Sequence, residues 1–205
     1  ILDEDSGKIP IIGETYIFKM RVETTADGPQ YQLKVWLQSV IEPVDWDLSG
    51  IGNPNDPANG SLVLIAHHVD ATFGNVQVVR VGSEPLPSTI VSDDFNSCNL
   101  NNDLWNFVNP VAGGDATLTI ANPFTDNAWL RISIPAGSDH DLLPNDNRAP
   151  RVMQPTNDTD FEVEAKFESG VDSRFQMQGI LVEESPSKFL RFEFHNDGVG
   201  TKAYI

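Results

Sequence analysis

The chain has 205 residues, with 30 acidic and 13 basic side chains and a formal net charge of −17. This charge repels phosphate backbones and anionic lipid, which disfavours nucleic-acid and membrane partners and leaves neutral or cationic ligands. The single cysteine, Cys98, excludes an intramolecular disulfide and a cysteine-based zinc cluster. The length permits one large β-sandwich or two small domains, and we predict one domain.

The loops favour a secreted protein, and the ends of the chain indicate a piece of a longer one. Acidic residues are dispersed through Asn- and Gly-rich loops, as in proteins exposed to salt or calcium, although an ordinary acidic soluble domain has a similar composition. Residues 1–5 lack the basic segment and apolar run of a signal peptide, and residues 201–205 stop inside a strand-like pattern. We therefore expect a piece of a larger extracellular protein whose leader lies outside this chain.

The alternation of apolar and polar residues predicts an all-β protein, because helical periodicity is almost absent. The pattern over 16–23, the turn at 26–29 and the second alternating stretch at 31–38 predict a hairpin. Segment 83–90, which contains two prolines, is expected to be a connector. Further strands are expected at 62–69, 76–81, 104–107, 116–121, 128–134, 161–168, 175–182 and 190–195.

Two ordered series of short motifs lie on either side of this connector. The series after it contains Asp94-Phe95, Leu104-Trp105, Asp160 to Ala165, Gln178 to Val182 and Phe189 to Phe192. The series before it contains Thr15-Tyr16, Leu33 to Trp36, Glu42-Pro43, Gly60 to Leu62 and Phe73 to Val76. The series after the connector resembles the opening strands of concanavalin A-like (laminin-G-like) jelly-roll domains, such as the module appended to bacterial β-xylosidases. The series before the connector resembles the closing strands of the same domains.

The two series occur in the reverse of the family's order, since the closing type occupies 1–82 and the opening type 91–205. The resemblance therefore implies one antiparallel two-sheet jelly roll that is circularly permuted and cut from a bacterial tandem repeat. Such a sandwich closes within one chain as a monomer, or exchanges halves as a domain-swapped dimer if connector 83–90 is too short.

A sugar site needs an aromatic platform for the apolar face of the ring and planar polar groups for its hydroxyls. Trp36 lies on a polar strand face, and further polar strand faces are predicted in the second half of the chain. If both sets lie on one open sheet, they form a groove; if Trp36 lies beneath a loop such as 43–60, it is core. The candidate ligand-binding residues are Lys34, Trp36, Gln38, Gln176, Gln178, Arg191 and Glu193.

Hard oxygen ligands near the junction of the two halves suit calcium better than magnesium or zinc, and related jelly rolls often hold a structural calcium ion there. The candidate metal ligands are Asp70, Asn75, Asp93 and Asp94. No EF-hand spacing is present, and Asx residues at the start of loops also cap turns without any metal. Structural Ca²⁺ is the one cofactor that we expect.

The leading hypothesis is a non-catalytic, lectin-like module that binds polysaccharide or packs against neighbouring domains of its parent chain. The alternatives are a structural or adhesive repeat without a ligand, and a glycoside hydrolase or lyase. Glu162 and Glu164 share a strand face, as paired glycanase carboxylates do, but Lys166 and Glu168 continue that face as ordinary solvated charge would. His67-His68 lies in an apolar strand, where we expect one ring to point inward as a structural histidine.

Overall fold

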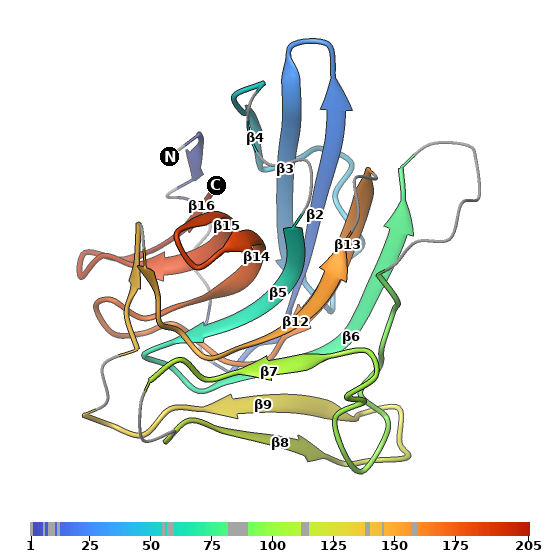
Figure 1. The fold of residues 1–205 in the computed structure, drawn as a ribbon, viewed down its shortest axis with the longest axis vertical. Coiled ribbons are helices and arrows are strands. Elements are labelled where there is room, and N and C mark those ends of the chain that lie inside the picture. Colours follow the sequence, from blue (N-terminus) through green and yellow to red (C-terminus); the bar gives the residue numbers. More distant parts are fainter. Residues whose placement is uncertain are drawn as a thin grey trace.

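The computed structural model describes residues 2–5, 7, 11, 13–54, 56, 60–81, 90–111, 115–137, 140–144, 146–156 and 160–205. Within these ranges there is no helix, and the chain forms two seven-stranded antiparallel sheets that pack face to face (Figure 1). No helix with the length and apolarity of a membrane span occurs in the described part of the chain. The prediction of an all-β protein with two antiparallel sheets is confirmed.

The two sheets are named here from their strand order. Sheet A consists of β1 (Glu4–Asp5), β16 (Thr201–Tyr204), β15 (Lys188–Asn196), β14 (Met177–Ser185), β5 (Gly60–His67), β12 (Arg151–Thr156) and β7 (Asn106–Val108). Sheet B consists of β4 (Leu48–Ile51), β3 (Gly28–Leu37), β2 (Tyr16–Thr25), β13 (Phe161–Phe167), β6 (Ala71–Arg80), β9 (Trp129–Ser133) and β8 (Thr117–Ala121). The short strands β10 (Leu142–Leu143) and β11 (Asp146–Asn147) pair with each other outside both sheets.

Each sheet interleaves strands from both halves of the sequence. In sheet A, β5 from the first half lies between β14 and β12 from the second, and in sheet B, β13 from the second half lies between β2 and β6 from the first. The two ends of the chain also meet, because the backbone N–H of Leu2 donates to the carbonyl of Ile205 at 2.8 Å. Residues 82–89, which hold nearly all of the expected connector, lie outside the described residues.

Alternation along each strand places one set of apolar side chains between the sheets. Phe18 and Phe167 of sheet B have ring centroids 4.2 Å apart, and Phe18 lies 4.6 Å from Phe194 of sheet A. Burial of each such ring contributes about 1.5–3 kcal/mol relative to exposure. Trp105 is buried in the same core, and its indole N–H donates to Asp93 Oδ2 at 2.8 Å.

Sheet A is covered on its outer face as well. A second apolar cluster contains Val63, Ile65, Met177 and Leu181 from β5 and β14, together with Leu142 and Ala149 from segment 140–149. Because apolar residues of β5 face both ways, the strand is a nearly unbroken hydrophobic run, as strands buried on both faces are. The outer face of sheet B, by contrast, carries mainly polar side chains.

The hairpin predicted from the first alternating stretches is confirmed as β2 and β3, with Thr25 opposite Gly28. The strand expected over 175–182 begins only at Met177, because Phe175 has a left-handed backbone conformation with φ of 69°. The short strands β1, β4, β10 and β11 were not among the predicted strands.

Gly179 in β14 offers a test of this packing. A Cβ atom built on Gly179 would lie 2.2 Å from the carbonyl oxygen of Phe192 and 2.7 Å from Cα of Glu193, so the neighbouring strand would have to move. We expect Gly179→Ala to lower the free energy of unfolding by about 1–3 kcal/mol, the usual cost of overpacking, as measured by urea denaturation. Gly200→Ala is the matched control, since nothing lies within 4 Å of its Cβ position. Equal unfolding midpoints for the two variants would contradict this account.

Candidate functional site

The outer face of sheet B has charged side chains arranged in rows across four strands. One row contains Lys34 of β3, Lys19 of β2, Glu164 of β13 and Gln77 of β6, each opposite the next in the strand register. The next row contains Gln32, Arg21, Glu162 and Val79 on the same strands. Basic residues on β2 therefore face acidic residues on β13, a cross-strand pairing that stabilises the sheet.

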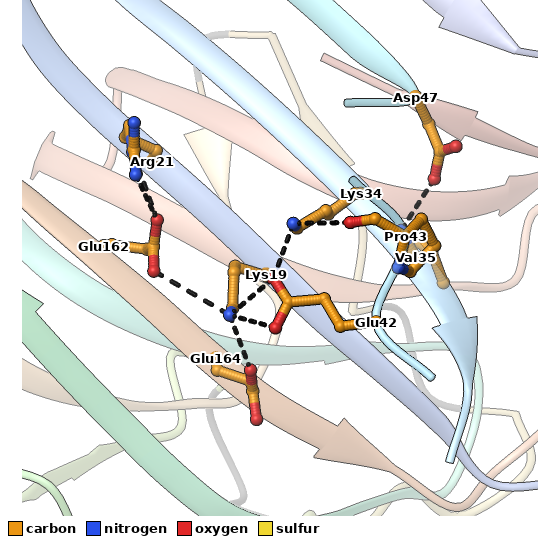
Figure 2. Close-up of polar contacts among 9 residues, drawn as sticks. All are labelled: Lys19, Arg21, Lys34, Val35, Glu42, Pro43, Asp47, Glu162 and Glu164. Carbon is orange, nitrogen blue, oxygen red and sulfur yellow. Dashed lines mark hydrogen bonds and ion pairs between the residues drawn. The ribbon is translucent and has the colours of Figure 1, made fainter. Parts of the chain in front are cut away.

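Lys19 is the centre of an ion network on this face (Figure 2). Its Nζ atom donates to both carboxylate oxygens of Glu42 at 2.8 Å and lies 3.0 Å from Glu164 Oε2. Arg21 binds Glu162 through Nε at 3.1 Å and Nη2 at 2.8 Å. Burial opposes the charge on Lys19, but the hydrogen bonds to Glu42 and Glu164 outweigh it and hold the pKa of Lys19 above its usual value.

The loop 38–47 folds back onto the β3 end of this face. Lys34 is 6% exposed, and its Nζ atom donates to the Pro43 carbonyl at 2.9 Å and pairs with Glu42. The loop is also anchored at Asp47, whose Oδ2 accepts the backbone N–H of Val35 at 2.8 Å. The buried ammonium group of Lys34 therefore has a carboxylate and a carbonyl as partners, and a buried charge requires such partners.

Trp36 does not provide an open stacking platform. The side chain is 8% exposed, and the ammonium groups of Lys19 and Lys34 lie 5.7 Å and 5.8 Å from its ring centroid. Trp46, in the loop, has Lys34 at 4.8 Å and Arg21 at 5.3 Å from its own ring. Trp36 was expected either to line an open groove or to be a core residue beneath a loop, and the structure agrees with the second interpretation.

A groove runs along the sheet from these charges. A hollow of about 190 Å³ shares Gln77 and Glu164 with a second of about 530 Å³, which shares Ser92, Asp93 and Asp94 with a third of about 530 Å³. The first hollow is lined by Lys19, Gln77, Val79, Glu162 and Glu164. The second is lined by Asn75, Val76, Gln77, Ser92, Asp93, Asp94 and Glu164.

Three of the four predicted calcium ligands, Asn75, Asp93 and Asp94, line this groove. Asp93 already accepts the N–H of Phe95 at Oδ1 and the Trp105 indole N–H at Oδ2, both at 2.8 Å, as a turn-capping residue does. Asp70 is not among the lining residues: it pairs with Arg131 and accepts the N–H of Ile134 at 3.0 Å. The predicted set of four is therefore not brought together, and calcium binding by the other three stays a prediction.

The two sets of predicted sugar-binding residues lie on different sheets, so they do not form one groove. Lys34 and Trp36 are on sheet B, whereas Arg191 and Glu193 lie on β15 of sheet A. Period-two alternation fixes which face of a strand a residue occupies, but it does not say which sheet the strand joins.

The remaining predicted residues have local structural contacts. Gln178 is almost fully buried, where Ser169 Oγ donates to its Oε1 and its Nε2 donates to the Ser169 carbonyl, both at 2.6 Å. Gln176 accepts the N–H groups of Asp172 and Ser173 at 2.9 Å, closing a turn. Gln38 is an exposed residue at the start of loop 38–47.

The sequence analysis did not identify Lys19, Arg21, Glu42 and Gln77 as site residues. One feature of the sequence could have identified Lys19 and Arg21. Both occupy the polar positions of an alternating strand, and their charge is opposite to that of Glu162 and Glu164. That signal becomes specific only once β2 is known to pair with β13. Glu42 lies in a loop without periodicity, and no pattern connects it to Lys19.

Glu193 on sheet A is an unusual acid. It is 1% exposed, and neither carboxylate oxygen has a hydrogen-bond partner among the described residues. Arg191 Nη1 lies 3.4 Å from Oε1, and His195 Nδ1 lies 4.0 Å from the same oxygen. Burial raises the pKa of Glu193 from 4.5 to about 7, against the opposing charge of Arg191.

Comparisons with protein-family models, curated proteins and solved structures found no significant match. The resemblance to concanavalin A-like domains therefore stays a prediction.

The raised pKa of Glu193 predicts a specific pH dependence of stability. Below pH 4.5 the carboxyl group of Glu193 is neutral in both the folded and the unfolded protein. Between pH 4.5 and about 7 the group is ionised in the unfolded chain but still protonated in the folded one, so the free energy of unfolding falls as pH rises. Relative to Glu193→Gln, which cannot titrate, we expect the wild type to lose about 3 kcal/mol across this window, at about 1.4 kcal/mol per pH unit. The measurement is the free energy of urea unfolding of both proteins from pH 4.5 to 8.

Taking the difference between the two proteins removes the titration of the other groups near Glu193. His67, which burial keeps neutral in the fold, stabilises the protein as pH rises and so acts in the opposite sense. Arg191, His195 and Tyr204, the charged or titratable neighbours of Glu193, are present in both proteins. A difference that stays constant from pH 4.5 to 8 would show that the carboxyl group is not perturbed.

Proposed function

We propose that this chain is a non-catalytic, extracellular carbohydrate-binding module of a larger protein, and that the groove on the outer face of sheet B holds the saccharide. The observation that carries the proposal is the groove's lining. Its exposed side chains include the amides of Asn75 and Gln77 and the carboxylate of Asp94, and the half-buried carboxylate of Glu164 lies beside them. A planar amide or carboxylate group can form hydrogen bonds with two adjacent sugar hydroxyls, as saccharide recognition requires.

The charge of the groove indicates which saccharides would fit. The hollows are lined by four acidic residues, Asp93, Asp94, Glu162 and Glu164, against one basic residue, Lys19, and the whole chain carries a net charge of −17. Such a surface repels uronic acids and sulfated sugars, whereas a neutral polysaccharide meets no such repulsion. Val79, which is 43% exposed, adds apolar surface beside the polar groups for the CH face of a sugar ring. A neutral polysaccharide is therefore the ligand class that we propose.

The ion pairs in the groove favour binding over catalysis. A glycosidase requires one carboxyl group that delivers a proton and a second that acts as a nucleophile or base. Here Glu162 is held by Arg21 through two nitrogens, and Glu164 is paired with Lys19 at 3.0 Å. Carboxylates fixed in this way suit the role of hydrogen-bond acceptors for hydroxyl groups.

The topology supports the finer proposal of a permuted concanavalin A-like jelly roll. Strands from residues 1–82 and 91–205 are interleaved within both sheets, and Leu2 is hydrogen bonded to Ile205. A domain whose halves complete each other in this way is compatible with circular permutation. A structural calcium ion at Asn75, Asp93 and Asp94 belongs to the same proposal.

Affinity electrophoresis in gels that contain neutral polysaccharides such as xylan, mannan and β-glucan tests the proposal. We expect at least one polymer to retard the wild type, and Gln77→Ala to bind it about three- to tenfold more weakly, since one net hydrogen bond is lost. Gln32→Ala is the matched control, because Gln32 lies on the same face but outside the groove lining.

Each other outcome points to a different function. No retardation by any polymer would favour a structural repeat without a ligand. Retardation that Gln77→Ala leaves unchanged would assign the sugar to another surface. Release of reducing sugar by the wild type that Glu164→Gln abolishes would identify a glycoside hydrolase.

A further inference from the structure

A histidine pair at the end of β5 lies on the outer face of sheet A, away from the groove. His67 follows the outward-facing Val63 and Ile65, and His68 has a left-handed backbone conformation with φ of 55°. That conformation breaks the alternation of the strand, so the two rings stack with centroids 4.1 Å apart and an interplanar angle of 23°. One of the two rings is buried, as expected, since His67 is 3% exposed, but alternation along β5 places it on the outer side of sheet A rather than between the sheets.

Asp141 completes a cluster of three potential metal ligands. It belongs to segment 140–149, which covers this face of sheet A. Its Oδ1 atom lies 3.4 Å from His67 Nε2 and 3.5 Å from His68 Nε2, and the three ligand atoms all lie within 4.8 Å of one another. The N–H···O hydrogen bonds of proteins are shorter, at about 2.7–3.2 Å.

The hydrogen bonding of His67 leaves a lone pair directed at this cluster. Its Nδ1 lies 2.9 Å from the carbonyl oxygen of Phe175, and because a carbonyl only accepts, Nδ1 carries the proton. In the neutral ring Nε2 is then unprotonated, and it has no hydrogen-bond partner among the described residues, although the side chain is only 3% exposed.

Two electron-rich atoms, His67 Nε2 and Asp141 Oδ1, thus face each other without a proton between them. A cation between the two would turn this repulsion into coordination. A histidine whose other ring nitrogen donates to a backbone carbonyl is the usual form of a metal-binding imidazole.

We propose that His67, His68 and Asp141 bind a divalent transition-metal ion of the zinc class. In a tetrahedral site with metal–ligand distances of about 2.0–2.2 Å, neighbouring ligand atoms are about 3.3–3.5 Å apart. Two of the three separations, 3.4 and 3.5 Å, match this, and the third, between the two histidine nitrogens, is within 4.8 Å. Two imidazole nitrogens and one carboxylate suit Zn²⁺ or a similar ion, whereas Ca²⁺ prefers oxygen ligands alone.

The surroundings leave the site accessible and set its charge. His68 and Asp141 have 31% and 40% of their side-chain surface exposed, so an ion can enter from solvent on their side. Three protein ligands leave a fourth position for water or a bound molecule. Arg191, whose charge acts on His67, lies 3.4 Å from Glu193.

Zinc titration of the full chain, freed of metal with EDTA, tests this inference with a chromophoric zinc chelator as competitor. We expect one Zn²⁺ per wild-type chain. Asp141→Asn and His68→Asn should bind at least about 10- to 100-fold more weakly, since loss of a ligand costs no less than loss of a partner that orients one. Asparagine suits position 68 because it tolerates positive φ.

Asp126→Asn, at an exposed acidic residue of the β8–β9 connection, is the control that removes the same charge elsewhere. Zn²⁺ should raise the melting temperature of the wild type and Asp126→Asn but not of Asp141→Asn, and Co²⁺ should give visible absorption bands with the first two proteins only. The inference is overturned if the wild type binds no stoichiometric zinc, if Asp141→Asn binds as tightly as Asp126→Asn, or if excess Ca²⁺ displaces the ion. None of these results depends on whether the groove of sheet B binds saccharide.

Discussion

The pairing of β13 with both β2 and β6 is the constraint on which the rest of sheet B depends. It sets Glu164 between Lys19 and Gln77, and Glu162 between Arg21 and Val79, in one register. A shift by one residue would turn these charges into the core and Val163 and Ala165 out of it. Burial of the apolar face therefore determines the register of these strands. The register in turn determines which charged side chains lie opposite each other, and so the ion pairs, the groove and the position of Glu42.

On sheet A the corresponding role belongs to a buried ion pair. Arg151 of β12 and Glu183 of β14 are 2.9 Å apart and almost fully buried, and Asn147 donates to Glu183 at 2.6 Å. Arg151 also donates to the carbonyls of Asn147 and Ala149, so the pair holds segment 140–149 against the sheet. Because Asp141 belongs to this segment, the same contacts keep its carboxylate beside His67. Removal of one partner would leave an uncompensated buried charge, which is strongly destabilising.

The sequence was sufficient to predict the strands and the face of each strand, but not the partner of each strand. Alternation correctly placed Lys34 and Trp36 on one face of β3 and Arg191 and Glu193 on one face of β15. Whether those faces adjoin depends on pairings over more than a hundred residues, which a period of two does not encode. Segments of two to four residues, such as β1 and β4, have too few positions to reveal a period. The left-handed turn at His68 was not foreseen because a positive φ is uncommon for any residue other than glycine, although histidine is among the residues enriched there.

The two outer faces differ in how completely their polar groups are satisfied. On sheet B, Lys19, Lys34 and Arg21 are each paired with a carboxylate, so the face is stable without a ligand. On sheet A, His67 Nε2, His195 Nε2 and both oxygens of Glu193 are buried without hydrogen-bond partners among the described residues. Such groups each cost stability, and folded proteins contain few of them. Sheet B has such an atom too, since Nε of Arg131 on β9 is buried without a hydrogen-bond partner among the described residues. On sheet A, His67 Nε2 lies 3.4 Å from Asp141 Oδ1, so the proposed cation would supply the partner that this nitrogen lacks.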